Sequence, residues 1–378
     1  MSKRKVDLIV LGPTPPYRGG ISDSNTAFIN SLLKLGLNIK VISFKRLYPN
    51  FLFPGKSQFI NEKIKFKKYE RKLDTINPFG WYRVRKLILK INPKFIIFRY
   101  WTPFLAPLYY FISKKTPQKI KKIAIVDNWI PHEKSLFDKI LNYYFAKNMN
   151  LFITFSKNVS DRIKKSGFKN IYSLYHPVND DLPDKISKKK ARKKLNLLED
   201  EKYVLFFGLI REYKGLDILI NSFSKNPIYK KKINLIILGE FYENINYYKR
   251  LINNLKLNSK VIMIPKFVDD FTIRDYFCAS DLIAQTYKKA SQSGVTPIAY
   301  KYNLPILVSN VKGLKEIILD DKSGCITKNN PDSISKNIVY CLKKKNQKLF
   351  IDQISSKYLK YTWKNFSLNL LNLLKNKF

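Results

Sequence analysis

Two basic side chains stand close together on one glycine-bounded segment in the second half of the chain. Arg211 and Lys214 lie between Gly208 and Gly215. A guanidinium and an ammonium on one short loop can clamp a diphosphate, because both offer positive charge and several donors. The segment is neither a GxGxxG nor a GxxxxGK[ST] motif, so it does not support dinucleotide binding or P-loop hydrolysis. We therefore predict a diphosphate-binding loop, with no metal ion and no cofactor required.

A second candidate anion contact lies at the end of the polar loop 285–293, where Ser293 and Gly294 open a short helical pattern. The Ser293 hydroxyl and the N–H groups of Gly294 and Val295 would face an anion there, as helix starts commonly do. Ser291, in the same loop, is a further expected contact. The alternative is an ordinary loop between a strand and a helix, with no ligand.

The elements that must hold these loops follow an alternating pattern of strands and helices. Val6–Leu11 is a predicted strand, and the proline-rich loop after it ends in Gly19 and Gly20. A helix follows over about 23–35. The pattern restarts at Tyr203, which predicts two doubly wound α/β halves with their loops at the carboxyl ends of the strands.

The basic run Ser187–Lys194 lies between the two halves, close to Pro183 and several acidic residues. Such a run is usually a solvated face, so we expect a linker with a short helix. Contact between this run and phosphate or lipid is the alternative.

The overall charge is far from balanced. The chain of 378 residues has 71 Lys and Arg against 28 Asp and Glu, a formal net charge of +43, while 45% of its residues are hydrophobic. The hydrophobic content is enough for two cores and argues against disorder. The charge favours an anionic partner, such as nucleic acid, an anionic membrane or a phosphorylated ligand. Compositional drift in an AT-rich genome is the other explanation.

Three cysteines without metal-type spacing and two histidines make a zinc site improbable and favour a reducing cytoplasm. The first apolar run, Val6–Gly12, is too short for a signal sequence, and no run approaches the length of a membrane span. The aromatic stretch Trp101–Ile112 has two interpretations: a core helix behind a strand, or a surface helix entering a lipid interface.

An ordered set of short motifs resembles the GT-B glycosyltransferases of the large retaining family 4, the glycosyl transferases group 1 type. Each motif is weak alone, but together they span nearly the whole chain in the expected order. They are Gly12-Pro-Thr-Pro-Pro-Tyr-Arg-Gly-Gly-Ile-Ser, Pro131-His-Glu, Phe207-Gly with Tyr213-Lys-Gly, Ala279-Ser-Asp-Leu, Ser293-Gly-Val, Pro305-Ile-Leu-Val-Ser, and Gly313-Leu-Lys-Glu with Ser323-Gly. Phe53-Pro-Gly-Lys-Ser resembles a feature of one subgroup.

The resemblance implies the GT-B fold, in which two Rossmann-like doubly wound domains face an interdomain cleft. A nucleoside-diphosphate sugar would bind mainly to the second half, and the acceptor to the first. Arg211 and Lys214 would hold the diphosphate beside Gly208, while Gly19 and Gly20 would lie near the phosphates or the transferring sugar. The implied domains are 1–178 with the last helix 362–378 packing back, a basic linker 179–200, and 201–361.

The chain departs from the family where carboxylates are expected. The family's E-x7-E motif would place acids at Ser291 and Ala299, and neither is acidic. Glu316 remains as a nearby carboxylate, although it could simply interact with a helix dipole. Asp127 replaces the family's usual histidine and is either a catalytic carboxylate or a loop residue. His132 is either a site residue or a loop histidine bonded to backbone.

The sequence thus predicts a retaining glycosyltransferase that extends a glycan or a lipid-linked glycan for cell-surface polysaccharide or glycoconjugate synthesis. We expect it to be cytoplasmic and peripheral on the anionic inner face of the cell membrane. One alternative is a catalytically impaired relative that only binds sugar nucleotides. The other, a nucleic-acid binder, rests on charge alone, since no nucleic-acid module is recognisable.

Overall fold

The computed structural model describes residues 6–49, 58–59, 69–129, 137–178 and 182–378, in two compact units. Unit 1 comprises Met1–Tyr175 and Trp363–Phe378, and unit 2 comprises His176–Thr362. The chain first passes from unit 1 to unit 2 after Tyr175, three residues before the expected boundary at 178. The chain returns to unit 1 at Trp363, within one residue of the expected start of the last helix.

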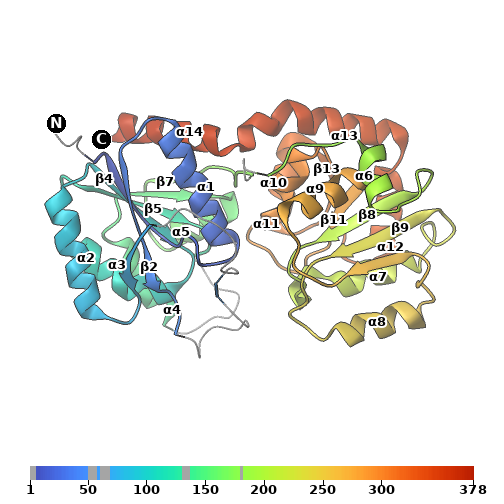
Figure 1. Cartoon of the computed structure of the whole chain (residues 1–378), viewed down its shortest axis with the longest axis horizontal. Helices are drawn as coiled ribbons and strands as arrows, with labels where there is room; N and C mark the ends of the chain where they lie inside the picture. The colour runs from blue at the N-terminus through green and yellow to red at the C-terminus, as the bar shows by residue number, and fades with distance from the viewer. Residues whose placement is uncertain (1–5, 50–57, 60–68, 130–136, 179–181) are drawn as a thin grey trace. The chain divides into compact units, whose positions relative to one another are not determined.

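Unit 1 is built on a parallel sheet of seven strands, in the order β3-β2-β1-β4-β5-β6-β7 (Figure 1). The strands are β1 (Leu8–Leu11), β2 (Ile39–Arg46), β3 (Glu70–Asp74), β4 (Phe95–Tyr100), β5 (Lys121–Val126), β6 (Leu151–Thr154) and β7 (Ile171–Ser173). The helices are α1 (Gly20–Lys34), α2 (Pro78–Ile91), α3 (Ala106–Lys114), α4 (Asp138–Ala146), α5 (Lys157–Lys165) and α14 (Trp363–Lys377). The described crossover from β1 to β2 is the strand–helix–strand unit that the sequence predicted.

Both faces of this sheet are covered, as the apolar strand sequences require. In β1, Leu8 and Val10 pack against α1 and α14, whereas Ile9 and Leu11 face the core beneath α2, α3, α4 and α5. Trp363 at the start of α14 is buried against Phe28 of α1. The last helix therefore belongs to the core of unit 1.

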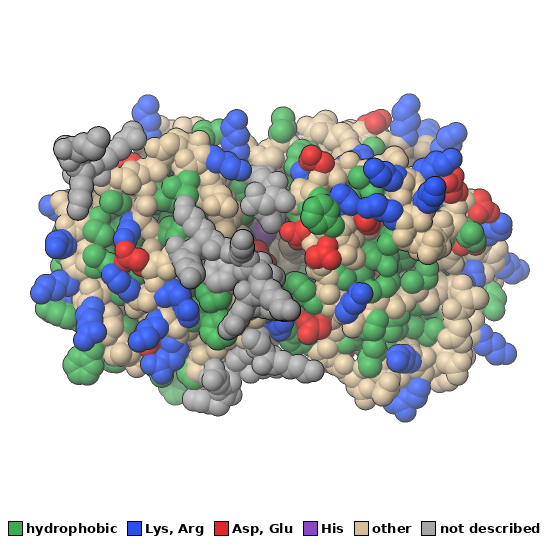
Figure 2. All heavy atoms as spheres, in the orientation of Figure 1, with side chains coloured by type: hydrophobic (Ala, Val, Ile, Leu, Met, Phe, Trp, Pro, Cys, Tyr) green, Lys and Arg blue, Asp and Glu red, His purple; other side chains and the backbone are tan. Residues whose placement is uncertain are grey.

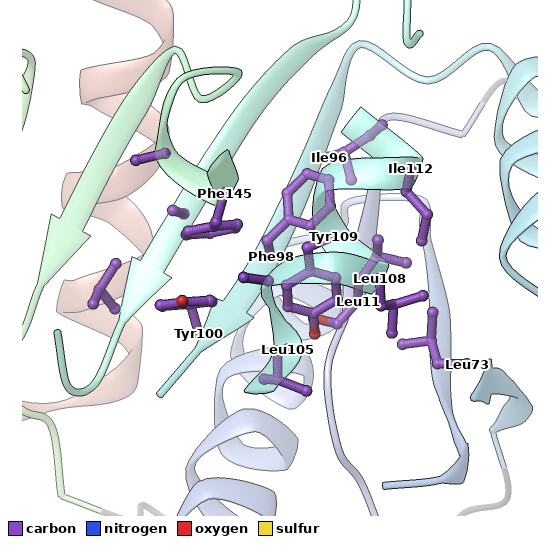
Figure 3. Close-up of a cluster of buried hydrophobic side chains, with 14 of the residues drawn as sticks. Leu11, Leu73, Ile96, Phe98, Tyr100, Leu105, Leu108, Tyr109, Ile112 and Phe145 are labelled. Carbon is purple, nitrogen blue, oxygen red and sulfur yellow. The ribbon is translucent and has the colours of Figure 1, made fainter. Parts of the chain in front are cut away.

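The aromatic stretch Trp101–Ile112 forms a short 3-10 turn, Pro103–Leu105, and then α3. Figure 3 shows Leu108, Tyr109 and Ile112 of α3 beside Phe98 of β4, and all four side chains are fully buried. The core-helix interpretation is thus correct for most of this stretch.

Unit 2 has a parallel sheet of six strands, in the order β10-β9-β8-β11-β12-β13. The strands are β8 (Lys202–Phe207), β9 (Ile233–Leu238), β10 (Val261–Ile264), β11 (Leu282–Gln285), β12 (Ile306–Ser309) and β13 (Gly324–Thr327). The helices are α6 (Lys188–Lys194), α7 (Leu216–Phe223), α8 (Ile245–Asn254), α9 (Asp270–Ala279), α10 (Val295–Lys301), α11 (Lys312–Asp321), α12 (Pro331–Cys341) and α13 (Lys344–Lys357). The chain order reverses at β8, with β9 on one side and β11 on the other, which is where ligands bind in doubly wound sheets.

The basic run expected to be a linker is instead part of unit 2. It forms α6, which Ser187 caps by accepting the N–H of Lys190. Arg192 of α6 is only 4% exposed and donates from Nη2 to the buried Asp281 Oδ2 at 2.7 Å. The run therefore anchors unit 2 through a buried ion pair, which a charge pattern alone does not reveal.

Candidate functional site

The loop after β8 is bent so that the Lys214 side chain folds back over Gly208. Gly208 has φ +110°, and a Cβ atom added there would lie 2.9 Å from Lys214 Nζ. Only glycine combines this backbone conformation with the required space. The next loop holds the bend in place: Lys288 N–H donates to Tyr213 O at 2.6 Å, and Thr286 Oγ1 donates to Gly215 O at 2.9 Å.

Lys214 is a buried cation without a counter-ion. It is 8% exposed, and over the described ranges Nζ makes no ion pair and no hydrogen bond. Its Nζ lies 5.5 Å from the centre of the Tyr287 ring. Burial, and secondarily the charge of Arg211, lower the pKa of Lys214 to about 8. Because an unpaired buried charge is costly, this site is arranged to gain stability from an anion.

Arg211 differs from Lys214 in exposure. Its guanidinium is exposed and lies 5.0 Å from the centre of the Tyr242 ring, the geometry of a cation–π contact. Tyr242 is itself held beside the loop, since its N–H donates to Ile210 O. The two cations are electrostatically coupled, so the structure does bring the sequence-predicted pair together.

The loop 286–294 lies against this pair but is organised differently from the expectation. A Cβ atom on Gly208 would lie 4.0 Å from the Val295 side chain, so the two loops are neighbours. The Val295 N–H, expected to face an anion, instead donates to Ser293 Oγ at 3.2 Å. Burial raises the pKa of the Tyr287 hydroxyl, and the nearby Ser293 side chain opposes this shift. Ser293 therefore caps its own loop, and Gly294 remains exposed at the start of α10.

The start of α11 supports the same loop from behind. A Cβ atom on Gly313 would lie 2.3 Å from the backbone carbon of Ser291, so only glycine permits this close approach. Glu316 follows three residues later on the same face of α11 and is half-buried. Ala299, where the family has a carboxylate, is fully buried within α10.

Unit 1 contains the remaining sequence-predicted residues. Gly19 caps α1, Gly20 is its first residue, and both are exposed. Asp127 follows β5 and is 1% exposed, with both carboxylate oxygens accepting from Arg99 Nη2 at 2.9 and 3.0 Å. Burial raises the pKa of Asp127, although Arg99 opposes the shift. Asp127 is therefore positioned as the partner of a buried arginine, and its catalytic role stays a prediction. His132 lies outside the described residues, as does the Phe53–Ser57 motif.

Two residues with clear structural roles at these loops were missed by the sequence reasoning. Tyr287 lies two residues after the end of β11, and its ring centre is 5.5 Å from Lys214 Nζ. Arg99 on β4 reaches Asp127 and also donates to Ser24 Oγ in the first turns of α1. Their position in the sequence could have identified them. Each lies at or just past the carboxyl end of a strand, where the loops of a parallel sheet converge.

Neither a metal-binding cluster nor a membrane-spanning helix is found in the described part of the chain. There, no group of three or more His, Cys, Asp or Glu side chains is arranged to hold a metal ion. Among the same residues, every helix is too short or too polar to cross a bilayer.

Comparison with known proteins gives these loops a family context. Residues 187–356 match the model of the family "Glycosyl transferases group 1". An uncharacterized glycosyltransferase of Methanocaldococcus jannaschii is 26% identical over 236 residues, which are 59% of each chain. The lipopolysaccharide 1,2-N-acetylglucosaminetransferase of Salmonella typhimurium is 25% identical, over 50% of this chain and 51% of that protein. The chain thus spans between half and three fifths of the length of these two relatives.

Solved structures establish the fold over nearly the whole chain. Anabaena HepE, crystallised in complex with UDP, superposes with a TM-score of 0.76 at 14% identity, covering 98% of this chain and all of HepE. The matched family model covers most of unit 2, including the Lys214 loop, and the strand orders of both units are those of doubly wound sheets. Residues 187–356 therefore resemble the group 1 glycosyltransferases, and the chain has the GT-B fold.

Proposed function

We propose that this protein transfers a sugar, with retention of configuration, from a nucleoside-diphosphate sugar to a glycan or lipid-linked glycan acceptor. The donor would bind at the carboxyl edge of the unit 2 sheet, with its diphosphate on Lys214 and Arg211. The observation that carries this proposal is Lys214, a buried cation for which the described residues supply no counter-ion. The UDP complex of Anabaena HepE supports a nucleotide donor by analogy of fold.

The division of labour between the two cations follows from their burial. Lys214 is held in place by its loop, so it would fix the position of the diphosphate at little cost in side-chain entropy. Arg211 is exposed and would close a second set of hydrogen bonds when the donor arrives. The backbone N–H of Gly294 is the remaining loop group for this role, because that of Val295 is already bonded to Ser293.

For the reaction we favour substitution on one face of the donor sugar. The bond from the anomeric carbon to the diphosphate oxygen breaks, and the bond to the acceptor oxygen forms on the same face. The acceptor's hydroxyl proton passes to the departing phosphate oxygen. Lys214 and Arg211 would stabilise the negative charge that develops on this leaving group. Neither position of the family's acidic pair carries a carboxylate that could act as a nucleophile.

The donor assignment is tested by thermal unfolding with UDP, GDP, dTDP and ADP, each with and without a sugar. We expect at least one nucleotide to raise the melting temperature of the wild type and not of Lys214→Met. Lys230→Met, a change at an exposed lysine of unit 2, is the matched control and should respond like the wild type. Equal stabilisation of wild type and Lys214→Met by every nucleotide would remove the diphosphate assignment.

A second candidate function is sugar-nucleotide binding without transfer. It is favoured by Ser291 and by the fully buried Ala299, which leave two expected donor contacts without carboxylates. Release of nucleoside diphosphate in the presence of acceptor glycans separates the two functions. Donor binding without release on any acceptor would favour the impaired relative.

Synthesis of cell-surface glycan also implies a location. We propose peripheral association with the anionic inner face of the cell membrane, where a lipid-linked acceptor would be available. The support is the formal net charge of +43, which attracts the chain to anionic surfaces. The lipopolysaccharide role of the Salmonella relative is a further analogy. Flotation with anionic liposomes at low salt tests this location, and failure to float would contradict it.

A further inference from the structure

The outward side of α2 carries apolar side chains where a surface helix usually carries polar ones. Phe79 is 81% exposed and Tyr82 is 52% exposed, while Val84 and Ile88 bury the opposite side of the helix. A core-facing helix needs only one apolar stripe. The second stripe on α2 therefore faces something other than the core of unit 1.

The same pattern recurs on α4 and on the residue before it. Phe137, Ile140 and Tyr143 follow each other at helical spacing and are 67%, 53% and 55% exposed, and Tyr144 adds another 43% exposed ring. The inward side of α4 is closed by Phe145 and Ala146. Two helices of one unit thus share an uncommon feature, an exposed aromatic stripe opposite a normal core stripe.

α3 joins the two stripes into one surface. Arg85 of α2 lies 5.6 Å from the ring centre of Tyr82 and 5.5 Å from that of Phe111 on α3. On the other side of α3, the ring centres of Tyr110 and Tyr144 are 5.4 Å apart. We call the outward surface of α2, α3 and α4 the α2–α4 face. Over the region where Figure 1 draws α2, Figure 2 shows hydrophobic and basic side chains next to one another.

The charged residues of this face are nearly all basic. Asp138 is the single acidic residue in α2, α3 and α4. The basic residues in or directly after these helices are Arg83, Arg85, Lys86, Lys90, Lys114, Lys115, Lys139 and Lys147. Within the described residues, none of them forms an ion pair with a carboxylate. Arg85, Lys114 and Lys147 lie over aromatic rings, and the other charges are available to an external anion.

The combination of exposed rings and uncommitted cations matches the headgroup region of a bilayer. Tyrosine and tryptophan rings favour this region because one end is apolar and the other polar, and lysine stems lie along apolar surface with the ammonium in the polar layer. Anionic lipid adds an attraction for each cation close to the surface. A soluble anion would use the cations and leave the exposed Phe79 and Ile140 without a role.

Single-stranded nucleic acid fits this face less well, because its bases need free ring faces to stack on. Lys147 Nζ already lies over three rings, 4.3 Å from the centre of Tyr144, 5.1 Å from Tyr110 and 5.7 Å from Tyr143. The Tyr143 and Tyr144 rings are also packed edge to face, at 79°. These three rings are therefore already packed against a cation or against each other.

We propose that the α2–α4 face of unit 1 is the surface by which this protein docks on an anionic lipid bilayer. The aromatic and aliphatic side chains enter the headgroup layer, and the surrounding lysines and arginines contact lipid phosphates. The proposal rests on the membrane association put forward under Proposed function and gives it a location. It is independent of the sugar-transfer chemistry.

The test measures binding of the full chain to vesicles of phosphatidylcholine with and without about 30% phosphatidylglycerol, by co-sedimentation at low salt. The ring variant combines Phe79→Ser, Ile140→Ser and Tyr143→Ser, and the charge variant combines Lys86→Gln, Lys90→Gln and Lys139→Gln. The control variant replaces three similarly exposed side chains of unit 2, in Tyr229→Ser, Tyr340→Ser and Leu349→Ser.

We expect the wild type and the control variant to bind anionic vesicles, with affinity lowered about tenfold or more in the ring and charge variants. Equal binding by wild type and ring variant, or an equal loss in the control variant, would overturn the assignment of the face. Binding to an oligothymidine that is lost in the ring variant, without vesicle binding, would replace the bilayer by nucleic acid.

Two further readouts keep this proposal separate from the proposed function. Each variant should keep the wild-type thermal response to nucleotide, which shows that it folds and that unit 2 is intact. A wild type that responds to nucleotide and ignores anionic vesicles would overturn the docking proposal while leaving the donor site standing. A wild type that binds anionic vesicles but no nucleotide would overturn the donor site and leave the docking proposal standing.

Discussion

Each unit buries a cation near the carboxyl end of its sheet, but the two cations differ in what surrounds them. Arg99 of unit 1 is fully buried and bonded to Asp127 and to Ser24 of α1. Lys214 of unit 2 is nearly as buried, and within the described residues it has no anionic partner. Burial alone therefore does not distinguish a structural charge from a binding charge.

The presence or absence of an internal anionic partner makes that distinction. A buried arginine that is neutralised internally orients the elements around it, here β4, the end of β5 and the first turns of α1. A buried lysine left without a counter-ion costs folding energy that an incoming anion can return. The contrast gives Arg99 a structural role beside α1 and supports the donor role proposed for Lys214.

The largest expected effect comes from breaking the Arg99–Asp127 ion pair of unit 1. Asp127→Asn should destabilise unit 1 by about 3–5 kcal/mol, because it leaves Arg99 buried and uncompensated. Urea unfolding of the variant measures this change. The double variant Arg99→Met with Asp127→Leu removes both charges and should recover much of the loss. Unchanged stability with abolished turnover would instead support the catalytic role predicted for Asp127.

Removing the charge of Lys214 should have the opposite effect on stability. Lys214→Met removes an uncompensated buried charge, so the nucleotide-free protein should gain stability, on the order of 1–3 kcal/mol. The same change should weaken nucleoside-diphosphate binding roughly 10- to 100-fold. Calorimetric titration and thermal unfolding of one preparation give both quantities. Loss of stability together with loss of binding would show that the lysine is structural.

The lowered pKa of Lys214 predicts a pH dependence of donor binding. In the free protein the ammonium loses its proton as pH rises through about 8, and an anion favours the protonated form. Affinity should therefore fall between about pH 7 and 9, by at most tenfold per unit, and binding should take up protons in that range. Calorimetry in buffers of different ionisation enthalpy measures this uptake. Lys214→Met should show a flat profile, and a flat wild-type profile would contradict the assignment.

Arg211 should give the smallest effect of the series. Because its guanidinium is exposed and screened by water, Arg211→Gln should weaken nucleotide binding by about tenfold or less and leave stability nearly unchanged. The effect should shrink as salt rises, unlike that of Lys214→Met. A larger loss for Arg211→Gln than for Lys214→Met would reverse the order of importance given to the two cations.

A second contrast separates the surfaces of the two units. In unit 1, eight exposed large apolar side chains lie on α2 or α4 or next to an end of these helices, namely Ile76, Phe79, Tyr82, Leu89, Phe137, Ile140, Tyr143 and Tyr144. In unit 2, the exposed apolar residues, such as Tyr229, Phe267 and Leu349, are distributed over different elements. Scattered single residues are normal for a protein surface, whereas a continuous patch indicates a partner.

The amino-acid sequence by itself determined the fold class and the placement of Arg211 and Lys214 together on one loop. Strand and helix patterns repeat twice, and parallel sheets need near-continuous apolar strands, so the two doubly wound units were predictable. Arg211 and Lys214 were also predictable, because residues three apart on one loop are neighbours in any structure.

What only the tertiary structure decided depends on contacts between residues far apart in sequence. The pairing of Asp127 with Arg99 joins two strands, and Arg192 of the basic run pairs with Asp281 almost ninety residues later. The Ser293 hydroxyl, expected to face an anion, accepts the Val295 N–H. A charge or a hydroxyl is visible in the sequence, whereas its partner depends on which elements the fold brings together, and that partner decides whether it supports the structure or binds a ligand.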